Sequence, residues 1–248
     1  MAIYMMREAI PITTAWIYHN ADLWLISLSS DGNSWITIAD KNLWATAVWN
    51  NWDALSANNC WNRYQRWNNY WFPYSWTITS STTRVDVTNY WPWNYYSSST
   101  FIKATYNPYC WDTTNNANLR WWVTWTNEAM QWPCNTWYHI PNTTEWGDVI
   151  SVWVSLWLWT SSWRASNLRK YLLLPLAWYR SYSNGDVFAG EWIYWTSNRH
   201  TEWNSYCLWF DNSTLDTPNS RYMATWWHIR PFKNEALQPD ETRTVLYQ

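Results

Sequence analysis

The chain has 248 residues and a net charge of −2, and this length suits one domain of moderate size with a proper hydrophobic core. The near-neutral charge gives no electrostatic reason to expect nucleic acid or an anionic membrane as a partner. The unusual feature is the composition, because 30 tryptophans stand beside only 4 glycines.

The N-terminal residues 1–34 are expected to be a separate segment, part of a region that precedes the domain. They lack the basic start and the continuous apolar stretch of a signal peptide. No run in the chain reaches the roughly 18 apolar residues of a membrane helix. We therefore expect no membrane insertion, and we expect the chain to be the C-terminal part of a longer exported protein.

The domain is expected over residues 35–234. It opens with the alternating sequence of residues 35–39, which predicts a strand. A long loop-rich region rich in Asn, Tyr, Ser and Thr follows to about residue 133, with a short strand predicted at residues 84–87. It contains a long insert at about residues 73–127. The polar tail, residues 235–248, is expected to be loosely ordered.

One helix is well signalled, over residues 143–158. Asn142 is placed to cap it, and Glu145 follows three residues later, as in a capping box. Apolar residues then recur at helical spacing. They are Trp146, Val149, Ile150, Trp153, Leu156 and Trp157.

Strand-like segments follow the helix, separated by polar turns. They cover residues 170–177, 192–196, 206–210 and 222–232. One helix followed by an antiparallel meander predicts an α+β fold.

The tryptophans stand where turn chemistry favours glycine. Glycine adopts positive φ without steric cost, and pairs such as Asn-Gly, Pro-Gly and Ser-Gly mark turns. Trp52, Trp93 and Trp163 occupy these slots after Asn, Pro and Ser. Glycine is also scarce, since average usage of about 7% would give roughly 17 in a chain of this length.

The economical hypothesis is a difference of genetic code. Some bacterial lineages read UGA as glycine and others as tryptophan, so a gene of the first kind translated with the second table would give this sequence. The alternative is a genuine tryptophan-rich binder of carbohydrate or peptidoglycan. UGG codons at Trp52, Trp93 and Trp163 would contradict the recoding hypothesis.

The four cysteines are Cys60, Cys110, Cys134 and Cys207. No pair has CxxC spacing, which argues against a structural zinc site. Their even number and wide spacing fit disulfides in an exported domain, with three possible connectivities. Four reduced, buried thiols are the alternative.

Several motifs of the second half resemble those of the Fibrobacter succinogenes major paralogous domain family. Residues 133–141 with Glu145 and Trp146 resemble its CPxGWHVPTxxEW signature. Residues 174–180 resemble LPaGYR, residues 194–197 resemble YWSS, residues 225–230 resemble YGFSVR, and residues 38–43 resemble the DKNLG opening of some members. The resemblance covers roughly residues 36–233, and the order and spacing of the motifs make it specific.

The resemblance implies a C-type-lectin-like domain. Such a domain is a compact α+β fold in which one main helix packs on a small twisted antiparallel sheet, with long loops on one side. Members look like surface or secreted modules, which implies an extracellular or cell-surface location. One departure is that Pro231 stands where the family usually has a cysteine that can pair with the equivalent of Cys134.

The resemblance also sorts the tryptophans. Positions 44, 137, 178 and 226 align with family glycines, which makes Trp44, Trp137, Trp178 and Trp226 glycine sites. Trp146 and Trp195 align with family tryptophans, which makes them genuine core or strand-packing residues.

No pattern in the sequence points to catalysis, a metal or a cofactor. No two of His19, His139, His200 and His228 are spaced i, i+4, and His139 is expected to bond locally. Neither a GxSxG elbow nor a phosphate-binding GxxxxGK[ST] loop is present, even with tryptophan rewritten as glycine. Asp211-Asn212 and Asn204-Ser205 are the nearest approach to calcium ligands, and the family signature does not require calcium.

Glycoside hydrolysis uses a pair of carboxylates, and five acidic residues of this chain are candidates for such a pair. Each has a simpler explanation. Glu145 is explained as a helix cap, and the remaining candidates as solvated turn residues. These are Asp148, Glu191, Glu202 and Asp211.

We therefore expect a non-catalytic, exported binding module whose partner is a carbohydrate or a surface protein. The alternatives are an enzyme on the same fold, such as a formylglycine-generating-type oxidase, and a purely structural surface spacer. The binding face is expected in loops that border the last strands, where polar and aromatic side chains gather. Its residues are Arg199, His200, Asn204, Tyr206, Asp211, Asn212, Asn219 and Arg221.

Overall fold

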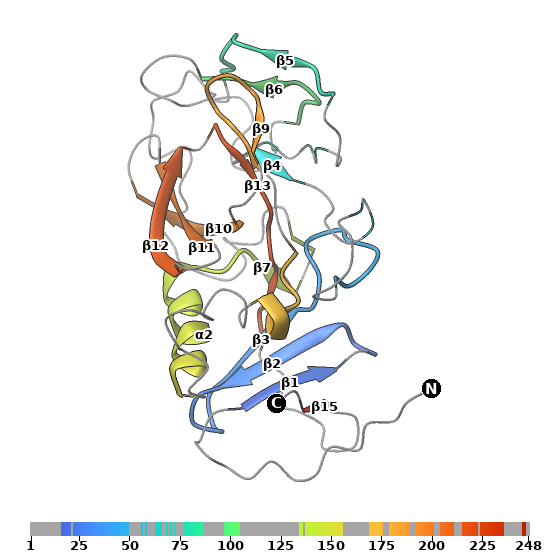
Figure 1. Ribbon diagram of the computed structural model, residues 1–248, viewed down its shortest axis with the longest axis vertical. Coiled ribbons are helices and arrows are strands. Elements are labelled where there is room, and N and C mark those ends of the chain that lie inside the picture. The colour runs from blue at the N-terminus through green and yellow to red at the C-terminus, as the bar shows by residue number, and fades with distance from the viewer. Residues whose placement is uncertain are drawn as a thin grey trace.

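The fold is seen in a computed structural model of the chain (Figure 1). The structure describes residues 16–20, 22–49, 77–86, 97–104, 137–155, 169–175, 179–188, 192–200, 204–210, 215–222, 224–235 and 245–246, with residues 56, 58, 63–65, 68, 70, 72, 134 and 135. Within these residues the chain is mainly β-sheet with one long helix, an α+β arrangement.

A six-stranded antiparallel sheet lies at one end of the molecule, in the order β15-β1-β2-β3-β14-β7 (Figure 1). Its strands are β1 (Trp16–Asn20), β2 (Leu25–Ser29), β3 (Trp35–Ala39), β7 (Tyr138–His139), β14 (Phe232–Lys233) and β15 (Val245–Leu246). The predicted strand at residues 35–39 is confirmed as β3. The sheet also takes β1 and β2 from the expected N-terminal segment and β15 from the expected tail, so a boundary at residue 35 would cut through it.

The hairpin between β2 and β3 turns at Asp31 and Gly32. Gly32 has a φ of 76°, the left-handed conformation that glycine adopts without strain. The Asp31 carboxylate accepts hydrogen bonds from the backbone N–H groups of Asn33 (2.8 Å) and Ser34 (2.7 Å). Because these donors stabilise its charged form, the pKa of Asp31 is lowered to about 2.

A second sheet is formed by β10 (Trp192–Arg199), β11 (Asn204–Phe210) and β12 (Leu215–Tyr222). The predicted strands at residues 192–196 and 206–210 are confirmed within β10 and β11. The sequence did not predict β12, because its segment is polar and contains Pro218. Proline is tolerated there since β12 pairs with β11 alone and the register shifts between Cys207 and Trp209.

The remaining strands are short. A four-stranded sheet has the order β4 (Tyr64–Gln65), β13 (Trp226–Trp227), β8 (Tyr179–Arg180) and β9 (Val187–Phe188), and β5 (Ser80–Ser81) pairs in parallel with β6 (Phe101–Ile102). These two strands lie at the end of the molecule away from the six-stranded sheet (Figure 1).

Three predicted strands need correction. Residues 169–172 form a helical turn rather than part of a strand at 170–177, because Tyr171, Leu172 and Leu173 pack into the core together and not alternately. Within residues 222–232, β13 and the start of β14 are separated by a stretch whose carbonyl groups accept hydrogen bonds from the N–H groups of Trp195, Leu43 and Ala39. Of residues 84–86, only Val85 makes an isolated bridge, and residue 87 lies outside the described residues.

The long helix is α2 (Thr143–Ser155), and it starts where the sequence predicted. The backbone N–H of Glu145 donates to the Asn142 side chain (2.9 Å), and the N–H of Asn142 donates to the Glu145 carboxylate (2.8 Å). This reciprocal pair is the predicted capping box. Residues 156–158 of the predicted helix lie outside the described residues.

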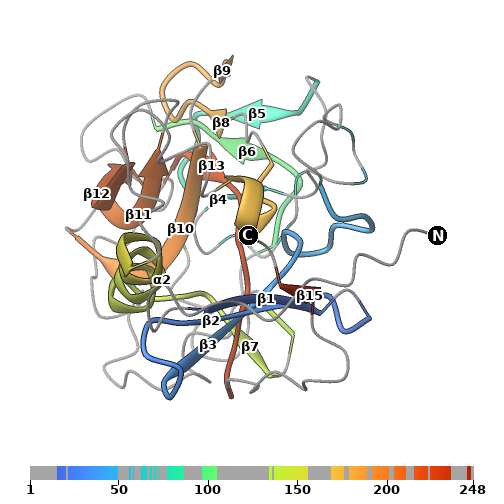
Figure 2. The same ribbon diagram turned by 60° about the horizontal axis from the view of Figure 1, so that its bottom comes forward.

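Helix α2 lies between the six-stranded sheet and the sheet of β10, β11 and β12 (Figure 2). Its apolar face packs against both sheets. Trp146, Val149 and Val152 are buried on this face, beside Tyr194, Leu208 and Phe210 of the second sheet and Ile26 and Leu28 of the first. Trp195, the other tryptophan expected to be genuine, is also buried and donates its indole N–H to the Tyr64 carbonyl (3.0 Å). The described residues include no helix with the length and apolarity to cross a membrane.

Removal of the N-cap tests the predicted start of α2. We expect Asn142→Ala to lower the free energy of unfolding by about 1 kcal/mol, because the N–H of Glu145 loses its acceptor. Urea denaturation measures the change. Thr144→Ala, an exposed position in the same helical turn, is the control and should change stability far less.

The Asp31 turn predicts a specific pH dependence. Because the folded pKa of about 2 lies below the ordinary 3.8, the stability that Asp31 contributes is fully present above pH 4 and is lost as the pH falls towards 2. We expect Asp31→Asn to flatten the fall in urea midpoint across this window. Asp22→Asn, another exposed aspartate, is the control, and an unchanged slope in Asp31→Asn would contradict the assignment.

Candidate functional site

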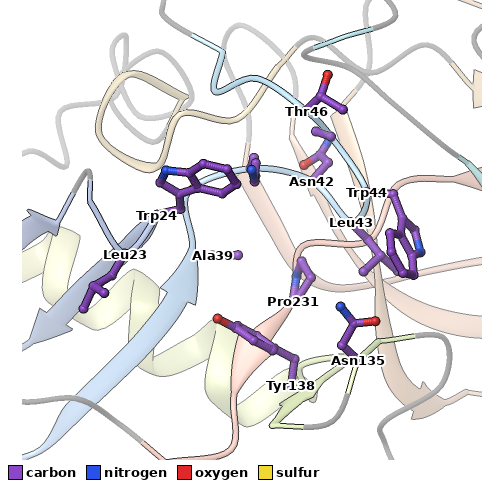
Figure 3. A pocket seen from close by; sticks show the side chains of 12 residues that line it. Leu23, Trp24, Ala39, Asn42, Leu43, Trp44, Thr46, Asn135, Tyr138 and Pro231 are labelled. Carbon is purple, nitrogen blue, oxygen red and sulfur yellow. The ribbon is translucent and has the colours of Figure 1, made fainter.

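A pocket of about 470 Å³ opens where β3 leaves the six-stranded sheet (Figure 3). It is built from the β1–β2 loop, the segment after β3, the turn before β7 and the residue before β14. The lining residues are Leu23, Trp24, Ala39, Lys41, Asn42, Leu43, Trp44, Ala45, Thr46, Asn135, Tyr138 and Pro231. This volume lies within the range of about 300–1,000 Å³ that is usual for small-molecule sites.

Backbone hydrogen bonds hold the segment after β3 in place. The N–H of Asp40 donates to the Trp24 carbonyl (2.9 Å), and the N–H of Leu43 donates to the Ile229 carbonyl (3.0 Å). The N–H of Ala39 donates to the Pro231 carbonyl (2.9 Å). Three segments far apart in sequence are therefore joined at the pocket.

Asn42 supplies a buried polar group to the pocket. Its side chain is 1% exposed, and its Nδ2 lies 3.3 Å from Nδ1 of His228. Its amide oxygen is buried and has no hydrogen-bond partner among the described residues. A buried carbonyl oxygen of this kind lacks the partner that such groups normally have.

Lys41 brings a positive charge to the pocket. Its ammonium nitrogen lies 3.0 Å from the centroid of the Trp24 ring, a cation–π contact. Burial lowers the pKa of Lys41, and the negative charge of Asp40 opposes this shift. Figure 3 shows Trp24 and Trp44 on opposite sides of the view, with Asn42 between them.

Tyr138 adds an aromatic ring from β7. Burial, followed by the charge of Asp40, raises the pKa of Tyr138, so this phenol stays protonated at neutral pH. The ammonium nitrogen of Lys233 lies 5.8 Å from the Tyr138 ring centroid. A second lysine therefore stands beside the residues that line the pocket.

Buried charges lie behind the pocket. Asp40 is fully buried, and one carboxylate oxygen lies 2.9 Å from Nε2 of His19. Arg230 is also fully buried and donates to the carbonyl groups of Ala39 and Leu173, both at 2.9 Å. The Asp40–His19 pair and the two hydrogen bonds of Arg230 hold the backbone that carries the pocket.

Three tryptophans have left-handed backbone, and two of them, Trp24 and Trp44, line the pocket. The φ angles are 60° at Trp24, 63° at Trp44 and 77° at Trp137, and the side chains are 52%, 51% and 64% exposed. Two of these positions, 44 and 137, are ones at which the sequence predicts a glycine site. The left-handed region costs a residue with a side chain roughly 1–2 kcal/mol.

The turns at Trp44 and Trp137 have the same form. The N–H of Ala45 donates to the Asn42 carbonyl (2.9 Å), and the N–H of Tyr138 donates to the Asn135 carbonyl (3.0 Å). In each turn the tryptophan is the third of four residues. A positive φ at this place is the mark of a type II turn, in which glycine is preferred.

Trp226 differs from these turns. It lies in β13, is fully buried and has no positive φ. Its ring lies 5.2 Å from the guanidinium carbon of Arg63 and 5.0 Å from that of Arg180. The geometry here gives no reason for glycine, in contrast to the expectation from the sequence. Trp178 lies outside the described residues.

Part of the binding face expected from the sequence is gathered at one end of the second sheet. The exposed His200 ring packs edge-on against the Tyr206 ring, with ring centroids 4.9 Å apart. The backbone N–H of His200 donates to the Asn204 carbonyl (3.1 Å). Arg199 ends β10. Asp211 and Asn212 lie outside the described residues.

The remaining predicted residues face the other way. Asn219 pairs with Cys207, and Arg221 pairs with Ser205, so both share the face opposite Tyr206. The guanidinium carbon of Arg221 lies 5.7 Å from the Trp209 ring centroid on that face. The prediction of one loop surface is therefore wrong for these residues, because they belong to strands whose alternation separates them.

The titratable side chains that the sequence singled out have local roles. His139 lies 2.8 Å from the Glu145 carboxylate and 3.0 Å from the Asn234 side chain, which confirms local bonding. Cys134 and Cys207 are both buried in one apolar cluster. Burial raises the pKa of the Cys134 thiol.

The disulfide expectation stays a prediction, since Cys60 and Cys110 lie outside the described residues. In the part of the chain that the structure describes, no three His, Cys, Asp or Glu side chains lie close enough together to hold a metal ion.

The pocket was not predicted from the sequence, because its lining comes from four separate segments without a common motif. The DKNLG-like stretch at residues 38–43 was the one local signal within it. Comparison of the chain with family models, curated proteins and solved structures finds no match.

The left-handed turns predict an unusual response to mutation. We expect Trp137→Gly to raise the free energy of unfolding by about 0.5–1 kcal/mol, because the relief of left-handed strain exceeds the entropy that glycine loses on folding. Trp137→Ala keeps the strain and should give no such gain. Thermal and urea denaturation measure both variants.

Trp35→Gly is the matched control. Trp35 is a half-buried residue of β3 without positive φ, so the same substitution there should destabilise the protein. Equal loss of stability in Trp35→Gly and Trp137→Gly would show that position 137 has no need of glycine.

Proposed function

We propose that the protein is a non-catalytic binding module of the C-type-lectin-like kind, which acts outside the cell or at its surface. Its ligand is a carbohydrate or a surface protein. The observation that carries this proposal is the pocket beside β3, in which aromatic rings, a lysine and a buried amide converge. A mostly apolar pocket with a few convergent polar groups is the usual form of a ligand site.

The arrangement of the described elements supports the proposed fold type. Among the described residues, one long helix, α2, packs against antiparallel sheets. This agrees with the main helix on an antiparallel sheet that the sequence resemblance implies.

The state of the described thiol at Cys134 supports a non-catalytic role. The thiolate is the reactive form of cysteine, and burial in an apolar cluster favours the protonated form. For the oxidase alternative, activity would have to depend on the cysteines. Activity that survives alanine replacement of all four cysteines would remove that alternative.

We also propose that the natural residue at positions 24, 44 and 137 is glycine. The left-handed φ at each position, the type II turns around Trp44 and Trp137, and the scarcity of glycine in the chain support this. The natural pocket would then be wider, because the indole rings of Trp24 and Trp44 would no longer line it. The codon at each position tests this directly, since UGA fits the proposal and UGG contradicts it.

The binding proposal is tested with the full chain on an immobilised glycan panel and in pull-downs from intact cell surfaces. We expect saturable binding to a glycan or a surface protein. Two substitutions in the pocket, Lys41→Gln and Asn42→Ala, should weaken binding, whereas the capping variant Asn142→Ala should leave it unchanged below its melting temperature. No binding in either format would favour the structural spacer instead.

A further inference from the structure

Resting on the proposed binding function, we infer that the pocket beside β3 takes an acidic saccharide, a pyranose that carries a carboxylate. The carboxylate meets the Lys41 ammonium, the apolar face of the sugar ring lies on Tyr138, and a sugar hydroxyl donates to the Asn42 amide oxygen.

The charge of the pocket selects an anion. Lys41 lines the pocket, and none of the twelve lining residues is a carboxylate. Lys233, beside the Tyr138 ring, adds a second positive charge at the edge. The nearby carboxylate of Asp40 is fully buried behind the pocket, where it pairs with His19. A ligand carboxylate therefore meets the Lys41 ammonium and no opposing charge among the lining residues.

The amide of Asn42 selects a hydroxyl donor. Its oxygen is buried at the pocket without a partner among the described residues, while the other end of the amide lies against His228. A bound hydroxyl would supply the missing hydrogen bond. A buried acceptor of this kind discriminates strongly between ligands that satisfy it and ligands that do not.

Tyr138 selects a flat, partly apolar ligand. Its ring lines the pocket together with Asn135 and Pro231 (Figure 3). The C–H face of a pyranose is apolar and stacks on such a ring, while its hydroxyl groups remain free for hydrogen bonds. The combination of ring, hydroxyl acceptor and cation fits an acidic sugar better than a peptide carboxylate, which offers no such face.

None of these three groups is a tryptophan. The inference therefore holds whether residue 24 is tryptophan or glycine. With tryptophan, the Lys41 ammonium lies on the indole ring and must be shared with the ligand. Trp24→Gly releases this ammonium, so binding of the acidic sugar should be kept or strengthened.

The test compares two probes that differ at one carbon, methyl β-D-glucuronide and methyl β-D-glucoside. We expect the glucuronide to bind the full chain more tightly, with a preference that falls as salt is raised. Affinities come from titration followed by NMR, in which the amide signals of Asn42 and Tyr138 should shift. These signals identify the site even where affinity is weak.

Substitution of Lys41 is the decisive variant. Lys41→Gln should lower glucuronide affinity by roughly five- to tenfold, as expected for a partly exposed ionic contact, and should leave glucoside affinity unchanged. Lys170→Gln is the matched control, since Lys170 also lies against a tyrosine ring, that of Tyr171, but does not line the pocket. It should change neither affinity.

The outcomes separate this inference from the proposed function. Equal affinity for the two sugars, no effect of Lys41→Gln, or loss of binding in Trp24→Gly would overturn the inference. If neither sugar binds while another glycan or a surface protein does, the inference fails and the binding module stands. If nothing binds in any format, both proposals fall.

Discussion

The buried guanidinium of Arg230 is the interaction on which the rest of the structure depends. It donates to the carbonyl of Ala39, at the end of β3, and to that of Leu173, just after a helical turn. The Leu173 carbonyl would be left buried and unpaired without it, which costs roughly 1–3 kcal/mol. One side chain near the end of the domain thus ties the first sheet to the core beside α2.

The pocket is a consequence of this junction. The chain leaves β3 at Ala39, turns at Asn42 to Ala45, and is held against the segment that contains Arg230 by the bond from Leu43 to Ile229. The tight turn on this path, from Asn42 to Ala45, has left-handed backbone at Trp44. The hydrogen bonds that join these segments therefore also set the shape of the pocket.

The sequence predicted what is local and periodic. The alternation of β3, the capping box of α2 and the apolar runs in β10 and β11 are each visible in a few neighbouring residues. It missed β12, which is polar, and the helical turn at residues 169–172, whose leucines are buried for tertiary reasons. The pocket was not predicted because Trp24, Asn42 and Tyr138 are far apart in sequence and come together only in the folded chain. Glycine sites were predicted at positions 44 and 137 from the family resemblance, and both have left-handed backbone, whereas Trp226 belongs to a strand.

Left-handed backbone at Trp24, Trp44 and Trp137 has a consequence for local opening of the chain. With tryptophan at each, about 1–2 kcal/mol of strain per turn is set against a total stability that for most domains is only about 5–15 kcal/mol. Such strain lowers the cost of partial opening where it is concentrated. The edge of the pocket would then open and close many times for each unfolding of the whole domain, and amide hydrogen exchange would be fastest there. With glycine at the same turns, this strain would be absent.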